Sequence, residues 1–230
     1  MRLVKLVLWD IKLQIKYGFY ALYGILTVIY IVFLQALPIS WREYASAIVI
    51  FTDPAAMGLF FMGAIVLLEK SQRLPCAIAV SPIRTRDYVT SKVVSLCFIS
   101  ILVAMILSIS VGGEHITSIV VGTGISSIIF SLFGMIIATK ITSLNQFILF
   151  TLPIEIVGFV PAIIHLFVGL PGEFTYYPVN LCIDYILGRE VPLFGIVILV
   201  LMIVVLYKIT CNLVSRMFVH SGGEYESSDK

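Results

Sequence analysis

Long, uninterrupted runs of apolar residues alternate with short polar connectors along the chain. Each run is roughly 20 residues long, the length with which an α-helix crosses about 30 Å of hydrocarbon. The run at 195–206 contains no polar residue, whereas a strand of a membrane barrel alternates apolar and polar residues. Since lipid satisfies no backbone N–H or C=O group, continuous apolar runs predict helices. The six predicted spans are 18–37, 44–68, 92–111, 116–139, 146–170 and 191–218.

The composition supports lipid as the solvent of this chain. Hydrophobic residues make up 60% of it, charged residues make up 12%, and the mean hydropathy is +1.09. Both percentages lie far from those of an average soluble domain. We therefore predict an all-α membrane protein with one six-helix transmembrane domain at 18–218. The net charge of +2 and the lack of a dense Lys/Arg run predict no nucleic-acid partner.

Basic residues near the ends of the spans predict how the bundle sits in the membrane, because cytoplasmic loops retain Lys and Arg. If the N-terminus is inside, only Arg42 and Arg189 of the 15 basic residues lie outside. An even number of spans returns the C-terminus to the same side. We expect a multi-pass protein of the cell membrane with both termini in the cytoplasm. The inside set is Arg2, Lys5, Lys12, Lys16, Lys70, Arg73, Arg84, Arg86, Lys92, Lys140, Lys208, Arg216 and Lys230.

Residues 1–17 form a separate amphipathic segment ahead of the first span. Basic residues and a tryptophan recur there at steps of three and four, which places them on one face of a helix. Such a helix would lie in the cytoplasmic interface with its cations toward anionic headgroups, either as an anchor alone or also in a mechanical role. The apolar run that follows is longer than the core of a signal peptide, so we expect it to be retained. The face consists of Arg2, Lys5, Trp9, Lys12 and Lys16.

Ionisable side chains inside a span cost several kcal/mol unless they are paired or hydrated, so each is a candidate site. Asp53 precedes Pro54, which breaks the helical hydrogen-bond pattern and predicts a kink. Asp53 would then either line a hydrated cavity or cap the helix that resumes after the break. Glu155 and His165 share the fifth span, which two prolines predict to be irregular, and are roughly 15 Å apart along its axis. That is too far for a direct pair, so each is expected to face another helix or a cavity.

The sequence contains no H-E-x-x-H, G-x-S-x-G or Walker motif and no paired intramembrane carboxylates. We therefore expect no enzyme activity, metal or cofactor in this chain alone. The external segment 171–190 carries aromatic residues typical of a membrane interface. The polar end, 219–230, is predicted to be a disordered cytoplasmic tail. Scattered positions without a C-x-x-C pair predict free thiols at Cys76, Cys97, Cys182 and Cys211.

The connector at 69–91 is the most informative polar segment. It begins with charged residues, continues with Leu74, Ala77, Ile78 and Val80, and breaks at Pro82. A loop that only rejoined two spans would need no short amphipathic helix. One that presses into a soluble partner would need it, because a rigid helix in a groove transmits displacement. The alternative is an interfacial helix that lies on lipid headgroups.

At this connector the chain resembles the permease subunits of ABC-2-type ATP-binding-cassette exporters, and within them the branch of fluoroquinolone-export permeases. Three stretches in the N-terminal part of the chain carry the resemblance. They are the entry to the first span at 9–20, the Asp53-Pro54 pair with the span that ends in Glu69-Lys70, and Ala-Ile-Ala-Val-Ser-Pro-Ile-Arg at 77–84 with Asp87-Tyr88 and Ser91-Lys92. The family's Gly-Thr-Leu-Glu run after Glu-Lys is replaced here by Ser-Gln-Arg-Leu-Pro-Cys at 71–76.

The resemblance implies a cytoplasmic coupling helix between the second and third spans. This helix would dock on a separate ATPase subunit, two per complex, and the ATPase would hold the ATP and Mg²⁺. The resemblance also implies a second permease copy in a homodimer, or a paralogue, with the N-terminal helix as a connecting helix and 171–190 as an outer re-entrant segment. The cargo would be hydrophobic or amphiphilic: drug-like, lipid-like or a peptide. The implied coupling residues are Gln72, Arg73, Leu74, Ala77, Ile78, Val80 and Arg84.

Two other function classes remain open from the sequence. A proton-coupled secondary transporter would use Asp53, Glu155 and His165, and its transport would collapse with the proton gradient in vesicles without ATPase. An intramembrane hydrolase would lose activity when Glu155 is replaced. An ATPase that co-purifies with the chain would favour the exporter over both.

Overall fold

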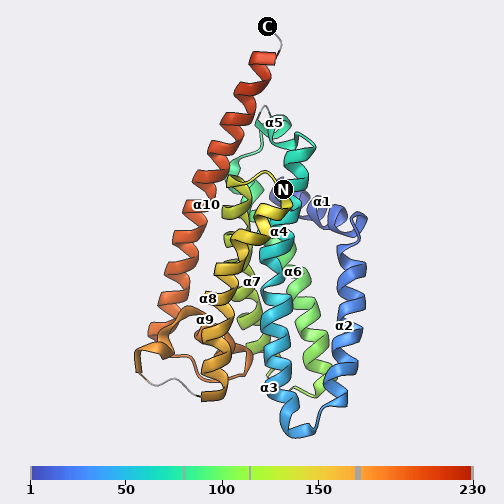
Figure 1. Cartoon of the computed structure of the whole chain (residues 1–230), viewed down its shortest axis with the longest axis vertical. Coiled ribbons are helices and arrows are strands. Elements are labelled where there is room, and N and C mark those ends of the chain that lie inside the picture. Colours follow the sequence, from blue (N-terminus) through green and yellow to red (C-terminus); the bar gives the residue numbers. More distant parts are fainter. Residues whose placement is uncertain (1, 80, 114, 169–171, 229–230) are drawn as a thin grey trace.

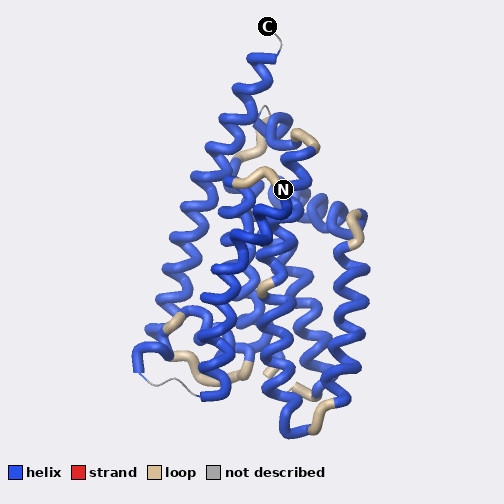
Figure 2. Tube along the Cα trace, in the orientation of Figure 1, coloured by secondary structure: helices blue, strands red, loops and turns tan. Residues whose placement is uncertain are grey.

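The computed structural model describes residues 2–79, 81–113, 115–168 and 172–228, which are helical almost throughout and contain no strand (Figure 2). The elements are α1 (Arg2–Lys16), α2 (Phe19–Ala36), α3 (Ile39–Ile50), the π-helical turn η1 (Phe51–Ala55), α4 (Met57–Ser71), α5 (Leu74–Ala79), α6 (Thr85–Val111), α7 (Ile116–Lys140), α8 (Leu144–Val168), the 3-10 turn η2 (Gly172–Tyr176), α9 (Pro178–Ile186) and α10 (Leu193–Ser228).

Six helical segments in these ranges are long and apolar enough to cross a membrane, which confirms the predicted number of spans. The second span is Ile39–Ser71, formed by α3, η1 and α4 in sequence, and it starts before the predicted position 44. The third span begins at Thr85 instead of 92, because polar residues at the end of an apolar run can still continue its helical hydrogen bonds. The all-α prediction is confirmed.

Helix α7 occupies the core, and its most extensive contact is with α4. Two glycines allow the two backbones to come together. A Cβ at Gly134 would collide with the backbone of Leu59, and one at Gly58 would collide with the Ser131 hydroxyl. Small residues at such crossings are the usual way in which membrane helices pack closely. In contrast, α2, α8 and α10 bury little of their apolar surface within the chain.

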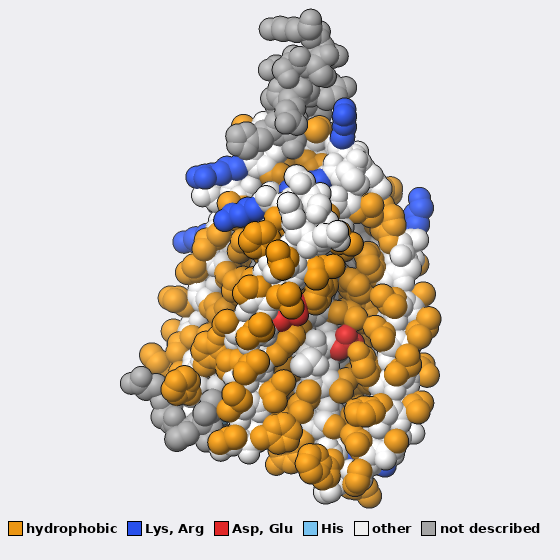
Figure 3. All heavy atoms as spheres, in the orientation of Figure 1, with side chains coloured by type: hydrophobic (Ala, Val, Ile, Leu, Met, Phe, Trp, Pro, Cys, Tyr) orange, Lys and Arg blue, Asp and Glu red, His pale blue; other side chains and the backbone are white. Residues whose placement is uncertain are grey.

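The two ends of the bundle differ in structure. Helix α1 runs crosswise to the spans and lies at the same end as α5 and the C-terminus, whereas α9 lies at the opposite end and packs on α7 and α8 (Figure 1). Lys and Arg side chains gather at the α1/α5 end, and the middle of the visible face is mostly hydrophobic (Figure 3). This distribution agrees with the segregation of basic residues in the sequence.

Two sequence-based expectations about helix ends and breaks are wrong. The predicted disordered tail continues α10 as a helix to Ser228, with positions 229–230 outside the described residues. Extension of an existing helix adds a hydrogen bond per residue, and no proline follows Pro192 to stop it. The fifth span is also continuous: α8 passes through Pro153 and Pro161 without a break. Proline in a membrane helix is tolerated when neighbouring groups satisfy the freed carbonyls.

Candidate functional site: a buried ion cluster beneath the N-terminal helix

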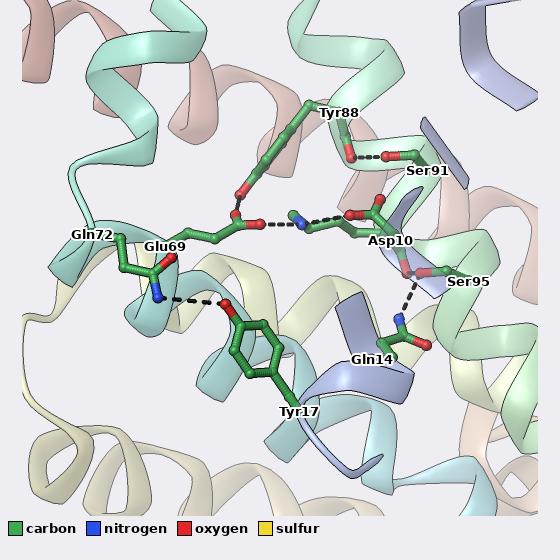
Figure 4. A network of polar contacts seen from close by, with 9 residues as sticks. Asp10, Gln14, Tyr17, Glu69, Gln72, Tyr88, Ser91 and Ser95 are labelled. Atoms are coloured by element: carbon green, nitrogen blue, oxygen red, sulfur yellow. Dashed lines mark hydrogen bonds and ion pairs between the residues drawn. The ribbon is translucent and has the colours of Figure 1, made fainter. Parts of the chain in front are cut away.

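A buried lysine joins three helices at the α1/α5 end of the bundle. Lys92 Nζ on α6 lies 3.0 Å from Asp10 Oδ1 on α1 and 2.5 Å from Glu69 Oε1 on α4. The hydroxyl of Tyr88 donates a 2.5 Å hydrogen bond to Glu69 Oε2, and the Lys92 ammonium lies 4.9 Å from the centre of the Tyr88 ring. Figure 4 shows Asp10, Glu69 and Tyr88 pointing toward one another from the three helices. The arrangement locks the start of α6 to the end of α4 and to α1.

The side of α1 that carries Asp10 and Gln14 faces the bundle. Asp10 and Gln14 are one helical turn apart, and both are buried, with 8% and 2% of their surface exposed. The Gln14 amide donates a 2.8 Å hydrogen bond to Ser95 Oγ, which in turn donates to the Lys92 carbonyl. Of the basic face expected from the sequence, Lys5, Trp9, Lys12 and Lys16 are exposed, and Arg2 begins α1 while its side chain lies outside the description.

The charged residues of this cluster depend on one another, because each would be buried without a partner if another were removed. A buried charge without a partner costs several kcal/mol, and removal of one member of a buried pair typically costs 3–5 kcal/mol. Lys92 is 3% exposed and cannot recruit water as a substitute partner. With Asp10 and Glu69 ionised, two carboxylates face one ammonium, so the cluster carries a surplus negative charge.

A cavity of about 410 Å³ opens beside the cluster, between α1, the end of α4, α5 and the start of α6. Its polar wall includes Asp10, Gln14 and Glu69, and its apolar wall includes Leu13, Leu68 and Ile78. The amide oxygen Oε1 of Gln14 is buried without a hydrogen-bond partner. The cavity therefore combines an apolar lining with an unsatisfied acceptor and a surplus carboxylate.

The predicted coupling segment contains a short helix, α5, which packs on α10 and α4. Arg73 forms the turn into it with a φ of 54°, a left-handed conformation that is rare for a residue other than glycine. Two of the predicted coupling residues, Leu74 and Ile78, are half-buried and line the cavity. Val80 lies outside the described residues. The exposed predicted residues are Gln72, Arg73, Ala77 and Arg84.

Lys70, next to the cluster, has a separate role at the end of α7. Its ammonium donates hydrogen bonds to the carbonyls of Ala138, Thr139 and Ile141 at 2.6, 2.9 and 2.9 Å. The last carbonyls of a helix lack intrahelical donors and carry the negative end of its dipole. Lys70 therefore caps α7 with its side chain, which the count of basic loop residues could not indicate.

Asp53 lies in the η1 turn, where the predicted disruption of the second span occurs as a π-helical turn. The capping interpretation is wrong: Ala56 is the N-cap of α4, and no side chain hydrogen-bonds there. Asp53 is half-buried and lies close to the Tyr30 side chain of α2. Glu155 is half-buried on α8, one turn after Thr151.

His165 pairs with an acid that the sequence analysis did not single out. His165 Nε2 on α8 is 3.0 Å from Asp184 Oδ2 on α9, and Arg189 Nη1 donates to Asp184 Oδ1 at 3.0 Å. Among the described residues, no hydrogen bond or ion pair links His165, Asp53 and Glu155 with one another. The three candidates for a proton relay are thus not joined to one another in the fold. As the spacing predicted, no disulfide joins any two of Cys76, Cys97, Cys182 and Cys211.

Comparison with known proteins identifies the class of this bundle. The model of the fluoroquinolones export permease protein family matches residues 1–220. The chain belongs to this family. Fluoroquinolones export permease proteins from two strains of Mycobacterium tuberculosis, CDC 1551 and H37Rv, are each 28% identical over 167 residues, which cover 71% of this chain and 70% of each relative. The six spans and the membership of an export permease family together establish a multi-pass membrane protein.

Proposed function

We propose that the chain is the membrane subunit of an ATP-driven exporter of the ATP-binding-cassette class. The observation that carries the proposal is α5, a short helix on the connection between the second and third spans. One side of the segment exposes Arg73 and Ala77, and the other side places Gln72, Leu74 and Ile78 against the cavity beneath α1. A partner that pushes on the exposed side would therefore act on the ion cluster through a rigid element.

The proposal orients the α1/α5 end toward the cytoplasm of a cell that carries the protein in its plasma membrane. The support is the accumulation of basic side chains at that end (Figure 3), whereas Arg42 lies near the start of α3 and Arg189 follows α9, at the opposite end of the bundle (Figure 1). In this orientation α1 is an interfacial helix, with Lys5, Lys12 and Lys16 available to anionic headgroups. Both termini are then cytoplasmic.

A second copy of the chain is part of the proposal. Asp53 and Glu155 are each only half-buried within one chain, although they lie in spans. Figure 3 shows acidic side chains in the middle of an otherwise apolar face. A carboxyl group against lipid costs several kcal/mol, so a second copy, or a hydrated path between two copies, is the environment that suits this face. The less buried helices α2, α8 and α10 offer further surface to a homodimer or a paralogue.

The energy source would belong to the partners. The chain has no Walker motif, so each permease would bind a separate ATPase subunit that holds ATP and Mg²⁺. The cargo would be hydrophobic or amphiphilic, a class that includes the fluoroquinolones for which the relatives are named. The proton-coupled alternative is not favoured, because its three residues have separate surroundings.

Reconstitution with the partner ATPase tests the proposal. Ala77→Asp and Arg73→Glu change only exposed side chains at α5, and each should reduce the cargo-stimulated ATPase rate and transport by about tenfold or more. The control Lys140→Glu changes another exposed basic residue and should leave both rates unchanged. Full coupling in both α5 variants, or transport that follows a proton gradient in vesicles without ATPase, would overturn the proposal.

A further inference from the structure

We propose that the cavity beneath α1 is a binding site for amphiphilic cations, that is, protonated amines attached to an apolar body. As a loading site for cargo, the inference rests on the proposed function. The binding itself requires neither ATP nor a partner.

The carboxylates beside the cavity outnumber the buried ammonium that they share. Asp10 Oδ1 contacts Lys92 at 3.0 Å, and Lys92 also serves Glu69, whose second oxygen accepts from Tyr88. Glu69 thus has a donor on each oxygen, whereas Asp10 shares a single ammonium with it. Both carboxylates line the cavity, where about a tenth of each side chain remains exposed. A surplus negative charge in a site of low dielectric attracts a cation more strongly than it would in water.

The side-chain oxygen of Gln14 is a hydrogen-bond acceptor without a partner. Gln14 is 98% buried, because only 2% of its surface is exposed. Its amide nitrogen is engaged with Ser95 Oγ at 2.8 Å, and its oxygen has no partner. Figure 4 shows the Gln14 amide with its nitrogen toward Ser95 and its oxygen away from that residue. Buried acceptors are normally satisfied, so this oxygen indicates a missing N–H or O–H donor. A protonated amine supplies such a donor together with the positive charge.

The cavity has the size and lining of a small-molecule site. The volume of about 410 Å³ is in the range of small-molecule sites, which are mostly apolar with a few placed polar groups. Leu6, Leu13, Leu68 and Ile78 supply the apolar wall. Lys16 also lines the cavity, but it is exposed, so water screens its charge far more than that of the buried carboxylates. The ligand would therefore place its amine at Asp10 and Gln14 and its apolar body along the leucines.

Tryptophan fluorescence gives a direct test, because Trp9 lines the cavity and Trp41, the other tryptophan, lies on α3. A Trp41→Phe protein in phosphatidylglycerol nanodiscs would be titrated with dansyl cadaverine, which carries a protonated amine. N-acetyl dansyl cadaverine is the matched neutral ligand. Energy transfer from Trp9 should show the amine binding about tenfold more tightly than the neutral ligand, a difference of ~1.4 kcal/mol.

Two variants test the polar groups in opposite directions. Asp10→Asn removes the surplus charge and should weaken amine binding about tenfold, while Gln14→Glu adds a carboxylate and should strengthen it about tenfold. Neither should change the affinity of the neutral ligand. Glu43→Gln, which removes a carboxylate near the other end of the bundle, should change nothing. Tighter amine binding by Gln14→Glu could not result from damage to the fold. The test therefore remains decisive even if Asp10→Asn unfolds.

Equal affinities for the two ligands, or amine affinities that ignore both substitutions, would overturn the inference. Addition of phosphatidylethanolamine to the nanodiscs separates two sources of the same chemistry. Competition would assign the site to the amine of a lipid headgroup, and lack of competition would assign it to soluble cations. Since no ATPase is present, failure of binding here leaves the ATP-coupling test of the proposed function unaffected.

Discussion

Lys92 of α6 and Asp10 of α1 form a 3.0 Å ion pair although they are 82 positions apart in the sequence. The pair is buried, and Glu69 shares the same ammonium at 2.5 Å. The amphipathic N-terminal segment is therefore attached to the bundle through its acidic side, while its basic side remains exposed.

Lys92→Met should destabilise the protein by about 3–5 kcal/mol, because it leaves two buried carboxylates without a cation. Thermal unfolding in detergent measures the loss, and Lys12→Met, at an exposed position on α1, should have almost no effect. Adding Asp10→Asn and Glu69→Gln to Lys92→Met should recover a large part of the stability. If the single variant unfolds at the same temperature as the parent, the cluster does not hold α1.

Gly134→Ala should destabilise the bundle by about 2 kcal/mol or more, since the new Cβ would collide with the backbone of Leu59 and force α4 and α7 apart. Gly24→Ala is the matched control. Its Cβ would meet nothing within 4 Å, and alanine is a better helix former than glycine, so stability should stay the same or rise. Equal shifts of the melting temperature in the two variants would contradict the close approach of α4 and α7.

Lys70→Met should cost roughly 1.5–3 kcal/mol, because three carbonyls at the end of α7 lose a charged donor. The control Lys140→Met removes an exposed lysine from the last turn of the same helix and should cost only tenths of a kcal/mol. Hydrogen exchange of the amides near 138–141 should rise in Lys70→Met alone. Equal exchange in both variants would show that Lys70 is not the cap.

Arg73→Gly should stabilise the protein by about 1 kcal/mol, because the left-handed φ of 54° is strained for a residue with a Cβ. Arg84→Gly provides the contrast: its φ of −80° is ordinary, so glycine would bring only an entropic cost there. The melting temperature should rise for the first and stay or fall for the second. A fall in Arg73→Gly would mean that the guanidinium makes contacts worth more than the strain.

The sequence predicted the parts of the fold that follow from local pattern. The length of the apolar runs predicted six spans. The recurrence of basic residues every three or four positions predicted a helix near the N-terminus, and the structure has one at Arg2–Lys16 with Lys5 and Lys12 exposed. The span boundaries were less accurate, because a helix that extends past its apolar run, as at Thr85, leaves no trace in hydropathy. The position of the π turn was predicted by Asp53-Pro54, but its form was not.

The ion cluster was not predicted, because none of its residues stands in an unusual sequence context. Lys92 was predicted to begin the third span and Glu69 to begin a connector, but a charge is matched with its partner only after the chain is folded. One local signal was present: Asp10 and Gln14 stand four residues apart among basic and apolar residues, which marks a second polar face on α1. The pairing of His165 with Asp184 likewise depends on how α9 folds back on α8.

The ion cluster also imposes an order on biosynthesis. Residues at the N-terminus leave the ribosome first, yet the buried side of α1 finds its cation only after residue 92 has been made. The partners of Lys70 are synthesised later still, since the carbonyls that it caps belong to Ala138, Thr139 and Ile141. A nascent chain that ends before 92 therefore carries an unpaired Asp10 and an undocked first helix. Synthesis of the third span therefore allows α1 to dock, and synthesis of the fourth completes this end of the molecule.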